Sequence, residues 1–255
     1  MLATALSVGR AADAPASSVF LVTDRPTDSV SPLVVPKGSF QFEAGYKYSR
    51  FDTEQGNLDE QSFPDFLFRY GLGEHFEARL FASGWNVTEV AGDSTTGFSD
   101  ITVGTKIQLT KPRGRMSITS LLIDVSLPTG SASETSDYVI PKVLLVGGYE
   151  LSDRYSLTYN IGPSLVTFKE AGSRETRWDL SYALAFAALA RSNINLFAEL
   201  YGAVKEGSAP ETRNLQVGTT IRVAPKLQLD FRVGAGLVSA SPEWFGGAGL
   251  AFRLP

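Results

Sequence analysis

Apolar and polar residues alternate along the chain from Gly38 onward, in segments of about ten residues that turns or loops separate. The first segment runs from Ser39 to Ser49. Its apolar positions are Phe40, Phe42, Ala44, Tyr46 and Tyr48, and the positions between them are Gln41, Glu43, Gly45, Lys47 and Ser49. A period of two is the period of a β-strand, because successive side chains of a strand point to opposite faces. The pattern therefore predicts strands with one apolar face and one polar face.

The same alternation recurs often enough to account for the rest of the chain. Clear segments lie at 100–109, 155–162, 177–186, 214–222 and 227–234. Less regular segments lie at Phe63–Tyr70, Phe76–Trp85, Met116–Leu127, Val139–Tyr149, Ile194–Tyr201 and Trp244–Leu254. Together they predict about twelve strands, and an even number is typical of single-chain bacterial barrels.

The connections between these segments alternate between short and long. The short ones are Gly71–His75, Thr110–Arg115, Glu150–Arg154, Arg191–Asn193 and Ala224–Lys226. The long ones are Phe51–Ser62, Asn86–Phe98, Pro128–Tyr138, Thr167–Thr176, Ala203–Arg213 and Val238–Glu243. Short turns at one end and longer loops at the other are typical of outer-membrane barrels, with the short turns in the periplasm. Both chain ends are then predicted at the periplasmic end.

A soluble β-sandwich or lipocalin-like barrel would alternate in the same way. The predicted strands are longer than the 5–6 residues usual in soluble sheets and approach the ~9–11 needed to cross a bilayer obliquely. A mean hydropathy of −0.01 does not argue against this, because lipid-facing and lumen-facing residues average out. The sequence therefore predicts an all-β fold, a single antiparallel transmembrane barrel over residues 38–255.

Two further features favour the membrane. Aromatic residues with a polar edge suit the membrane–water boundary, and eight of them fall near predicted strand ends: Tyr46, Tyr48, Tyr70, Trp85, Tyr149, Tyr155, Trp178 and Trp244. The last strand, Gly249–Leu254, has the Gly-x-x-Φ-x-Φ pattern of a barrel-assembly signal, in which Phe252 and Leu254 share a face. It departs from that pattern in ending on Pro255. We expect this strand to engage the barrel-assembly machinery.

The N-terminal part divides into two predicted units. Residues 1–20 hold a short apolar run and the small residues Ala11–Ala16, but no basic start. They are interpreted as the remnant of a signal peptide, the alternative being a disordered arm. Residues 21–37 precede the first strand at the periplasmic end. We expect them to fold into the lumen as a plug, with Asp24 and Arg25 pairing to charges of the wall, and a flexible periplasmic tail is the alternative.

A set of short motifs resembles one known family. Thr23-Asp24-Arg25-Pro26, Ser31-Pro32 and Pro36-Lys37-Gly38 look like its opening, and Phe42–Tyr46, Leu127–Gly130 and Tyr149–Ser152 continue in its order. The family comprises outer-membrane proteins of the MetA pathway of phenol degradation, often described as transporters. The resemblance covers Leu21 to Leu254. It implies an outer-membrane barrel that admits small or aromatic compounds.

The polar faces of the predicted strands supply the candidate pore-lining residues. They carry charges of both signs: Glu43, Lys47, Arg69, Glu77, Arg79, Lys106, Lys142, Asp179, Glu199, Arg222, Asp230 and Arg232. Inside a narrow barrel these groups must pair or stay hydrated, because an unpaired buried charge costs several kcal/mol. Two interpretations stay open: a salt-bridged lumen that only stabilises the barrel, and a selectivity lining for a polar or anionic solute.

Catalysis has little support in the sequence. Outer-membrane enzymes with a histidine base need it near a Ser or Asp at the outer rim, whereas the single histidine, His75, falls in a predicted periplasmic turn. We expect no cofactor and no metal site, since cysteine is absent. A net charge of −4 argues against nucleic-acid binding.

The sequence thus predicts a channel or transporter-like barrel of the bacterial outer membrane, for passive passage of a small solute. Its expected partners are outer-membrane lipid, lipopolysaccharide and that solute. A structural or adhesive barrel with a sealed lumen is the alternative, and an outer-membrane lipid-modifying enzyme is less favoured.

Overall fold

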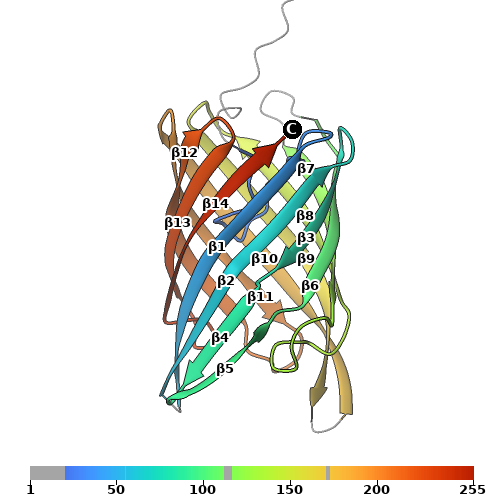
Figure 1. Cartoon of the computed structure of the whole chain (residues 1–255), viewed down its shortest axis with the longest axis vertical. Coiled ribbons are helices and arrows are strands. Elements are labelled where there is room, and N and C mark those ends of the chain that lie inside the picture. Colours follow the sequence, from blue (N-terminus) through green and yellow to red (C-terminus); the bar gives the residue numbers. More distant parts are fainter. Residues whose placement is uncertain (1–20, 55, 112–116, 171–172) are drawn as a thin grey trace, which may run out of the picture.

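The computed structural model describes residues 21–54, 56–111, 117–170 and 173–255, and they form an all-β molecule (Figure 1). The signal-peptide prediction for residues 1–20 lies outside this part of the chain. The strands are β1 (Phe40–Thr53), β2 (Gly56–Gly71), β3 (Phe76–Ala82), β4 (Trp85–Val90), β5 (Asp93–Phe98), β6 (Ile101–Gln108), β7 (Ile118–Leu127), β8 (Ile140–Glu150), β9 (Tyr155–Glu170), β10 (Ser173–Arg191), β11 (Ile194–Lys205), β12 (Thr212–Ala224), β13 (Leu227–Gly236) and β14 (Trp244–Leu254). Among the described residues, there is no helix long and apolar enough to cross a membrane.

The sheet closes on itself, because β1 pairs with β14 on one side and with β2 on the other. β2 pairs with β3 along Phe66–Gly71 and with β4 along Leu58–Phe63, so β3 and β4 are consecutive parts of one barrel strand. β5 and β6 form the next barrel strand in the same way, since β4 pairs with β5 and β3 with β6. The fourteen segments therefore make a closed twelve-stranded antiparallel barrel, as the sequence predicts. Closure pairs the strands of the wall on both sides, as a lipid environment requires, and β5 at one end of the barrel keeps an edge without a strand partner among the described residues.

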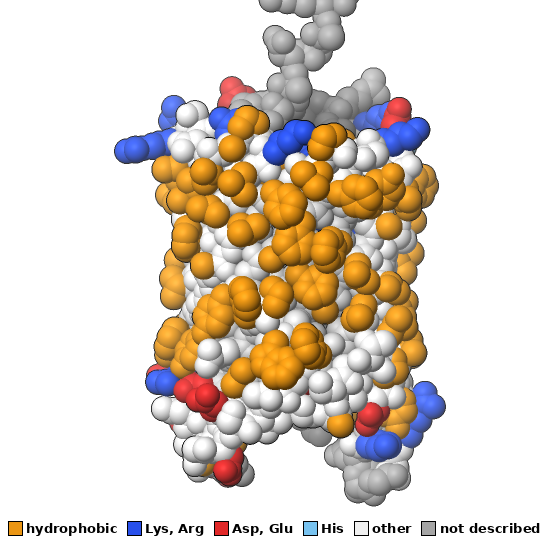
Figure 2. All heavy atoms as spheres, in the orientation of Figure 1, with side chains coloured by type: hydrophobic (Ala, Val, Ile, Leu, Met, Phe, Trp, Pro, Cys, Tyr) orange, Lys and Arg blue, Asp and Glu red, His pale blue; other side chains and the backbone are white. Residues whose placement is uncertain are grey.

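The two faces of the wall differ as the alternation predicts. On β1, Phe40 is 55% exposed on the outside, whereas Glu43 on the inside is fully buried. On the face shown in Figure 2, apolar side chains form a broad band across the barrel, and charged side chains gather at its two ends. Trp85, Trp178 and Trp244 point outward with about half their surface exposed (43%, 53% and 43%). This arrangement matches a lipid-facing surface with aromatic residues near its boundary.

The connections separate into two kinds at the two ends of the barrel. Short turns, such as 151–154 and 192–193, lie at the end that holds the C-terminus. Several of the predicted long loops prove to be strand instead: β1 runs to Thr53, β2 begins at Gly56, and Asn86–Phe98 is the β4–β5 hairpin. These extensions have polar residues on both faces, because both faces meet water, so no apolar alternation marks them. The predicted loop Pro128–Tyr138 does lack strands, and it extends by one residue to Val139, because β8 begins at Ile140.

Candidate functional site: the barrel lumen

Leu21–Pro36, called the inner segment below, lies inside the barrel at the end that holds the C-terminus (Figure 1). It has no strand or helix of its own, so its backbone N–H groups need other partners. Carboxylates of the wall provide them. The N–H groups of Asp24 and Arg25 donate to Glu43 on β1, at 2.9 and 3.0 Å, and that of Val35 donates to Glu77 on β3, at 2.8 Å.

The opposite wall holds the middle of the inner segment in the same way. The N–H groups of Asp28 and Ser29 donate to Glu199 on β11, at 2.9 and 2.6 Å. The N–H group of Val30 donates to the Asn160 side chain on β9, at 2.9 Å. Because β1 and β3 lie across the lumen from β9 and β11, the inner segment bridges the lumen.

Asp24 lies within a cluster of three wall cations from β2, β3 and β6. Its carboxylate accepts from Arg79 at 2.5 Å and from the Lys106 ammonium at 3.2 Å, and it lies 3.4 Å from the Arg69 guanidinium. The N–H group of Ser31 donates to it as well, at 3.0 Å. The Arg69 and Lys106 side chains are fully buried. The inner segment thus places a carboxylate where the wall concentrates positive charge.

Two wall carboxylates complete this cluster. Arg69 contacts Glu43 at 3.1 Å and Glu77 at 2.8 Å, and Glu77 also pairs with Arg79 at 2.9 Å. A third wall carboxylate, Asp124 on β7, lies 3.9 Å from Arg79 at the edge of the cluster. Removing charges from water costs several kcal/mol per ion unless partners surround them. The ion pairs within the cluster therefore allow its central groups to be buried.

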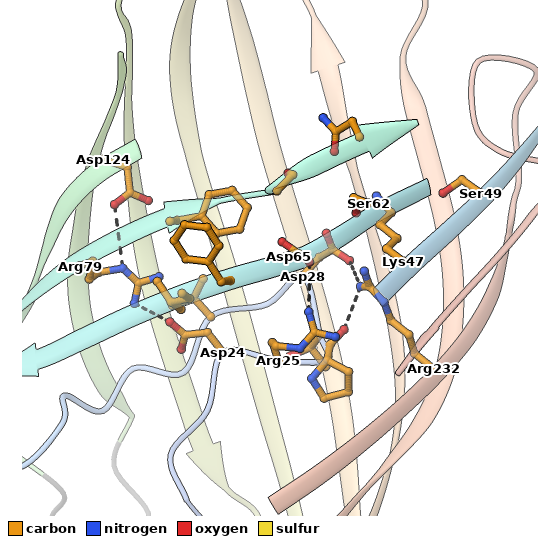
Figure 3. Close-up of a pocket in the computed structure, with 18 of the residues that line it drawn as sticks. Asp24, Arg25, Asp28, Lys47, Ser49, Ser62, Asp65, Arg79, Asp124 and Arg232 are labelled. Atoms are coloured by element: carbon orange, nitrogen blue, oxygen red, sulfur yellow. Dashed lines mark hydrogen bonds and ion pairs between the residues drawn. The ribbon is translucent and has the colours of Figure 1, made fainter. Parts of the chain in front are cut away.

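Arg25 lies on the other side of the same bend of the inner segment (Figure 3). Its guanidinium pairs with Asp65 on β2 at 3.0 Å and with Asp230 on β13 at 3.3 Å. Gly45 and Gly249 face each other on β1 and β14, and a methyl group on either would overlap the guanidinium. These two glycines therefore leave the space that Arg25 fills.

Asp28 lies beside a third group, on β11, β12 and β13. Its carboxylate pairs with Arg232 at 3.1 Å, as Figure 3 shows, and accepts from the Gln216 side chain at 3.3 Å. Gln216 also donates to Glu199. The Asp28 side chain is 42% exposed, so this group is wetter than the cluster around Asp24.

Two cavities lie on either side of the inner segment. The larger, of about 460 Å³, opens among strand ends opposite the short turns and is bordered by Lys47, Lys142 and Leu144. The smaller, of about 260 Å³, lies toward the short turns. Arg25, Pro26 and Thr27 border both cavities. The bend of the inner segment at these three residues is therefore the boundary between the two halves of the lumen. The larger cavity is called the outer vestibule below.

The loop Pro128–Val139 lies at the mouth of the outer vestibule. Asp100, between β5 and β6, accepts from the N–H groups of Gly130 and Ser136, both at 2.9 Å, and from the Ser136 hydroxyl at 2.7 Å. Glu134 in the loop accepts from the Asn86 side chain at 2.7 Å and borders the vestibule. Asp100 thus fixes the loop that helps to line the entrance.

The structure brings most of the sequence-predicted site residues together. Arg69, Glu77, Arg79, Lys106 and Glu43 surround Asp24, and Asp230, Glu199 and Arg232 meet Arg25, Asp28 and Ser29. Lys47 and Lys142 border the outer vestibule, and neither has an ion pair within 4.0 Å among the described residues. Two lie apart: Asp179 pairs with Arg177 at 2.8 Å, and Arg222 lies near the short-turn end of β12.

Sequence reasoning missed several members of the site, among them Asp65, Asp28, Gly45 and Gly249. Asp65 was missed because the β1–β2 register shifts next to Pro64, so the alternation from Phe63 does not carry through. A proline within a strand is a known sign of such an irregularity. Asp28 and the two glycines, Gly45 and Gly249, carry no signal in a single sequence, because their role depends on where the inner segment lies.

His75 lies in the short turn between β2 and β3, where the sequence predicts it. This turn is at the opposite end of the barrel from the outer vestibule. Within the described ranges, no group of three or more His, Asp or Glu side chains is placed to hold a metal ion.

The barrel resembles solved outer-membrane structures. The NanC porin aligns with a TM-score of 0.57 at 7% identity, over 84% of this chain and 100% of that one. The translocator domain of the autotransporter NalP from Neisseria meningitidis aligns with a TM-score of 0.54 at 12% identity, over 85% of this chain and 88% of that one. The β domain of the Bordetella autotransporter BrkA aligns with a TM-score of 0.52 at 11% identity, over 85% of this chain and 99% of that one. At such identities the likeness concerns the fold.

The class of protein follows from the closed topology, from the apolar band on the outer surface and from the likeness to these solved structures. The protein is a β-barrel of the bacterial outer membrane. No curated protein matches the sequence significantly. The family model described as "Putative MetA-pathway of phenol degradation" matches residues 23–254, and the chain belongs to that family. The resemblance of the sequence motifs is thereby confirmed.

Proposed function

We propose that the protein is a channel for passive passage of a small solute across the outer membrane, closed by the inner segment at rest. The observation that carries this proposal is the pair of cavities that meet at Arg25, Pro26 and Thr27. The wall around them is a closed barrel, and the barrier between them is a loop without secondary structure. Moving that loop would join the two cavities without breaking the barrel.

The size of the lumen supports a small solute. Barrels of eight strands are filled by side chains, and those of 16–18 strands enclose an aqueous channel. A twelve-stranded barrel lies between them, and the outer vestibule of about 460 Å³ is within the usual range for small-molecule sites. Apolar Leu122 and Leu144 line it beside Lys142 and Asp124. This mixed lining suits a compound with an apolar body and a polar group, and the phenol-degradation family makes an aromatic compound the first candidate.

A sealed structural barrel is the second candidate, and one observation favours it. The cluster around Asp24 is buried and each of its cations is paired, as in a lumen that only stabilises the wall. The two candidates differ in whether the inner segment can move.

Single-channel conductance in a planar bilayer distinguishes the two. We expect the full-length protein to give brief conductance steps and a variant lacking residues 21–36 to give larger and longer ones. A control variant lacking part of an extracellular hairpin, such as 91–92 at the β4–β5 turn, should behave as the full-length protein does. If both full-length and deleted proteins are folded, as heat-modifiable migration on a gel would show, and both are silent, the lumen is sealed and the channel proposal is wrong.

We propose no catalytic role for the lumen. The single histidine of the sequence, His75, lies in a turn at the short-turn end of the barrel, far from the outer leaflet. For assembly we propose that β14, with Phe252 and Leu254 on one face, engages the barrel-assembly machinery. The acidic extracellular ends of the hairpins would meet lipopolysaccharide through divalent cations.

A further inference from the structure

We infer that the cations around Asp24 form a carboxylate-binding site of the solute pathway, which Asp24 occupies at rest as a tethered substitute for an anionic solute. The inference rests on the proposed function and names the chemical class that the site takes, a carboxylate. A solute carboxylate and the inner segment would then compete for the same cations.

The groups around Asp24 have the geometry of an anion-binding site. Arg79, Lys106 and Arg69 approach its two oxygens from three strands at 2.5, 3.2 and 3.4 Å. The Ser31 N–H group adds a fourth donor at 3.0 Å, but it belongs to the inner segment and would leave with it. The three cations belong to the wall and would stay. Charged hydrogen bonds of this kind are the strong ones, and two arginines supply the planar donors that match a carboxylate.

The pairing of the wall cations points the same way. Without Asp24, the three wall cations Arg69, Arg79 and Lys106 keep Glu43 and Glu77 as close partners, and Arg79 keeps Asp124 only at 3.9 Å. These cations then lose a close partner in a site where their side chains are at most 7% exposed. An uncompensated buried charge is strongly unfavourable. An anion that takes the place of Asp24 would therefore stabilise an open pore.

The site can be reached from outside the barrel. Asp24 and Arg79 both border the outer vestibule, whose wall also carries the unpaired Lys142. A carboxylate that enters the vestibule could thus approach Arg79 before the inner segment leaves. The surroundings of Asp28 are different, because Arg232 is its one cationic partner among the described residues and the Asp28 side chain is 42% exposed.

Chemical rescue tests the inference without any transport measurement. The variant Asp24→Ala leaves space for a small carboxylate beside the three cations. We expect sodium formate, compared with sodium chloride at equal ionic strength, to raise its thermal unfolding midpoint by several degrees. The wild type and Asp28→Ala should show no difference between the two salts. Equal midpoints of Asp24→Ala in formate and chloride would overturn the inference.

A second measurement on the wild type decides the matter if Asp24→Ala does not refold. Formate or benzoate that competes with Asp24 should accelerate amide hydrogen exchange in residues 22–35 several-fold over chloride, and leave the strands unchanged. Unchanged exchange in this range would also overturn the inference. Neither readout depends on conduction, so a silent bilayer would count against the channel alone, and a failed rescue against the carboxylate site alone.

Discussion

The two halves of the lumen use charge in opposite ways. In the half near the short turns, the inner segment leaves a cavity of about 260 Å³, and Arg69, Glu43 and Glu77 are fully buried and paired. In the other half the vestibule is open, and Lys47 and Lys142 have no ion pair within 4.0 Å among the described residues. Where the inner segment covers the polar inner face, charged side chains bind that segment. In the outer vestibule, we propose that the unpaired charges are available to a solute.

The largest expected effect is a loss of stability when a buried charge of the half near the short turns is removed, compared with removal of a charge at the surface. Replacing Arg69 by Met leaves Glu43 and Glu77 without their shared partner, and breaking a buried pair in this way costs about 3–5 kcal/mol. The Lys111→Met variant is the control. Lys111 pairs with Glu74 but its side chain is 67% exposed, so this pair should contribute less than about 1 kcal/mol to the free energy of unfolding. Urea unfolding in detergent measures both. An Arg69→Met barrel as stable as the control would show that this half is hydrated.

The next effect concerns the boundary between the halves. Replacing Arg25 by Ala removes its pairs with Asp65 and Asp230. Losing one charged hydrogen bond costs about 1.5–3 kcal/mol, or roughly tenfold or more in an equilibrium. We expect the open fraction in single-channel records to rise by at least that factor. Arg177→Ala is the control, since Arg177 pairs with Asp179 on its own strand. An open fraction that rose equally in both variants would mean that Arg25 has no special role.

A smaller and more local effect is expected at the mouth of the vestibule. The Asp100→Ala variant loses the bonds from Gly130 and Ser136 that fix the loop Pro128–Val139. Each such bond contributes about 0.5–3 kcal/mol. Amide exchange of residues 129–136 should therefore accelerate about tenfold, with the inner segment unchanged. Protection that survived the substitution would show that other contacts of the loop, such as that of Glu134 with Asn86, suffice to hold it.

The smallest effect concerns the open half. Lys47→Gln and Lys142→Gln remove charges that face water, so stability should change by less than about 1 kcal/mol. The reversal potential in a salt gradient should still shift toward cations, because the vestibule loses positive charge. The Lys111→Gln variant, outside the vestibule, should leave the reversal potential unchanged. A stability loss comparable to that of Arg69→Met would show that the vestibule is as dry as the other half.

The sequence is informative about the wall and much less about what the wall contains. Alternation predicts the strands and their inward residues because lipid outside and water or charge inside impose a period of two on every strand. It fails at the extracellular hairpins, where both faces meet water and β1, β2, β4 and β5 extend beyond the predicted strands. The end of one strand cannot be located once the contrast between its faces disappears.

The contents of the lumen depend on contacts between residues far apart in sequence. The inward position of Glu43 or Arg69 follows from alternation on its own strand. That Asp24 meets β2, β3 and β6 while Asp28 meets β13 depends on the path of a segment without periodicity. The need for Gly45 and Gly249 follows only once Arg25 is placed between them. Such pairings are set in three dimensions and leave no local pattern.

The central claim is that the inner segment must move for a solute to pass, and a reversible crosslink tests it most directly. A Cβ atom on Gly148 of β8 would lie 3.0 Å from Cγ of Pro32, so the two Cβ atoms are at most roughly 4.5 Å apart, which suits a disulfide. The chain has no cysteine of its own. In the double variant Pro32→Cys/Gly148→Cys, conductance should be lost on oxidation and return on reduction, while both single variants conduct in either condition. Equal conductance of the oxidised and reduced double variant would contradict the claim.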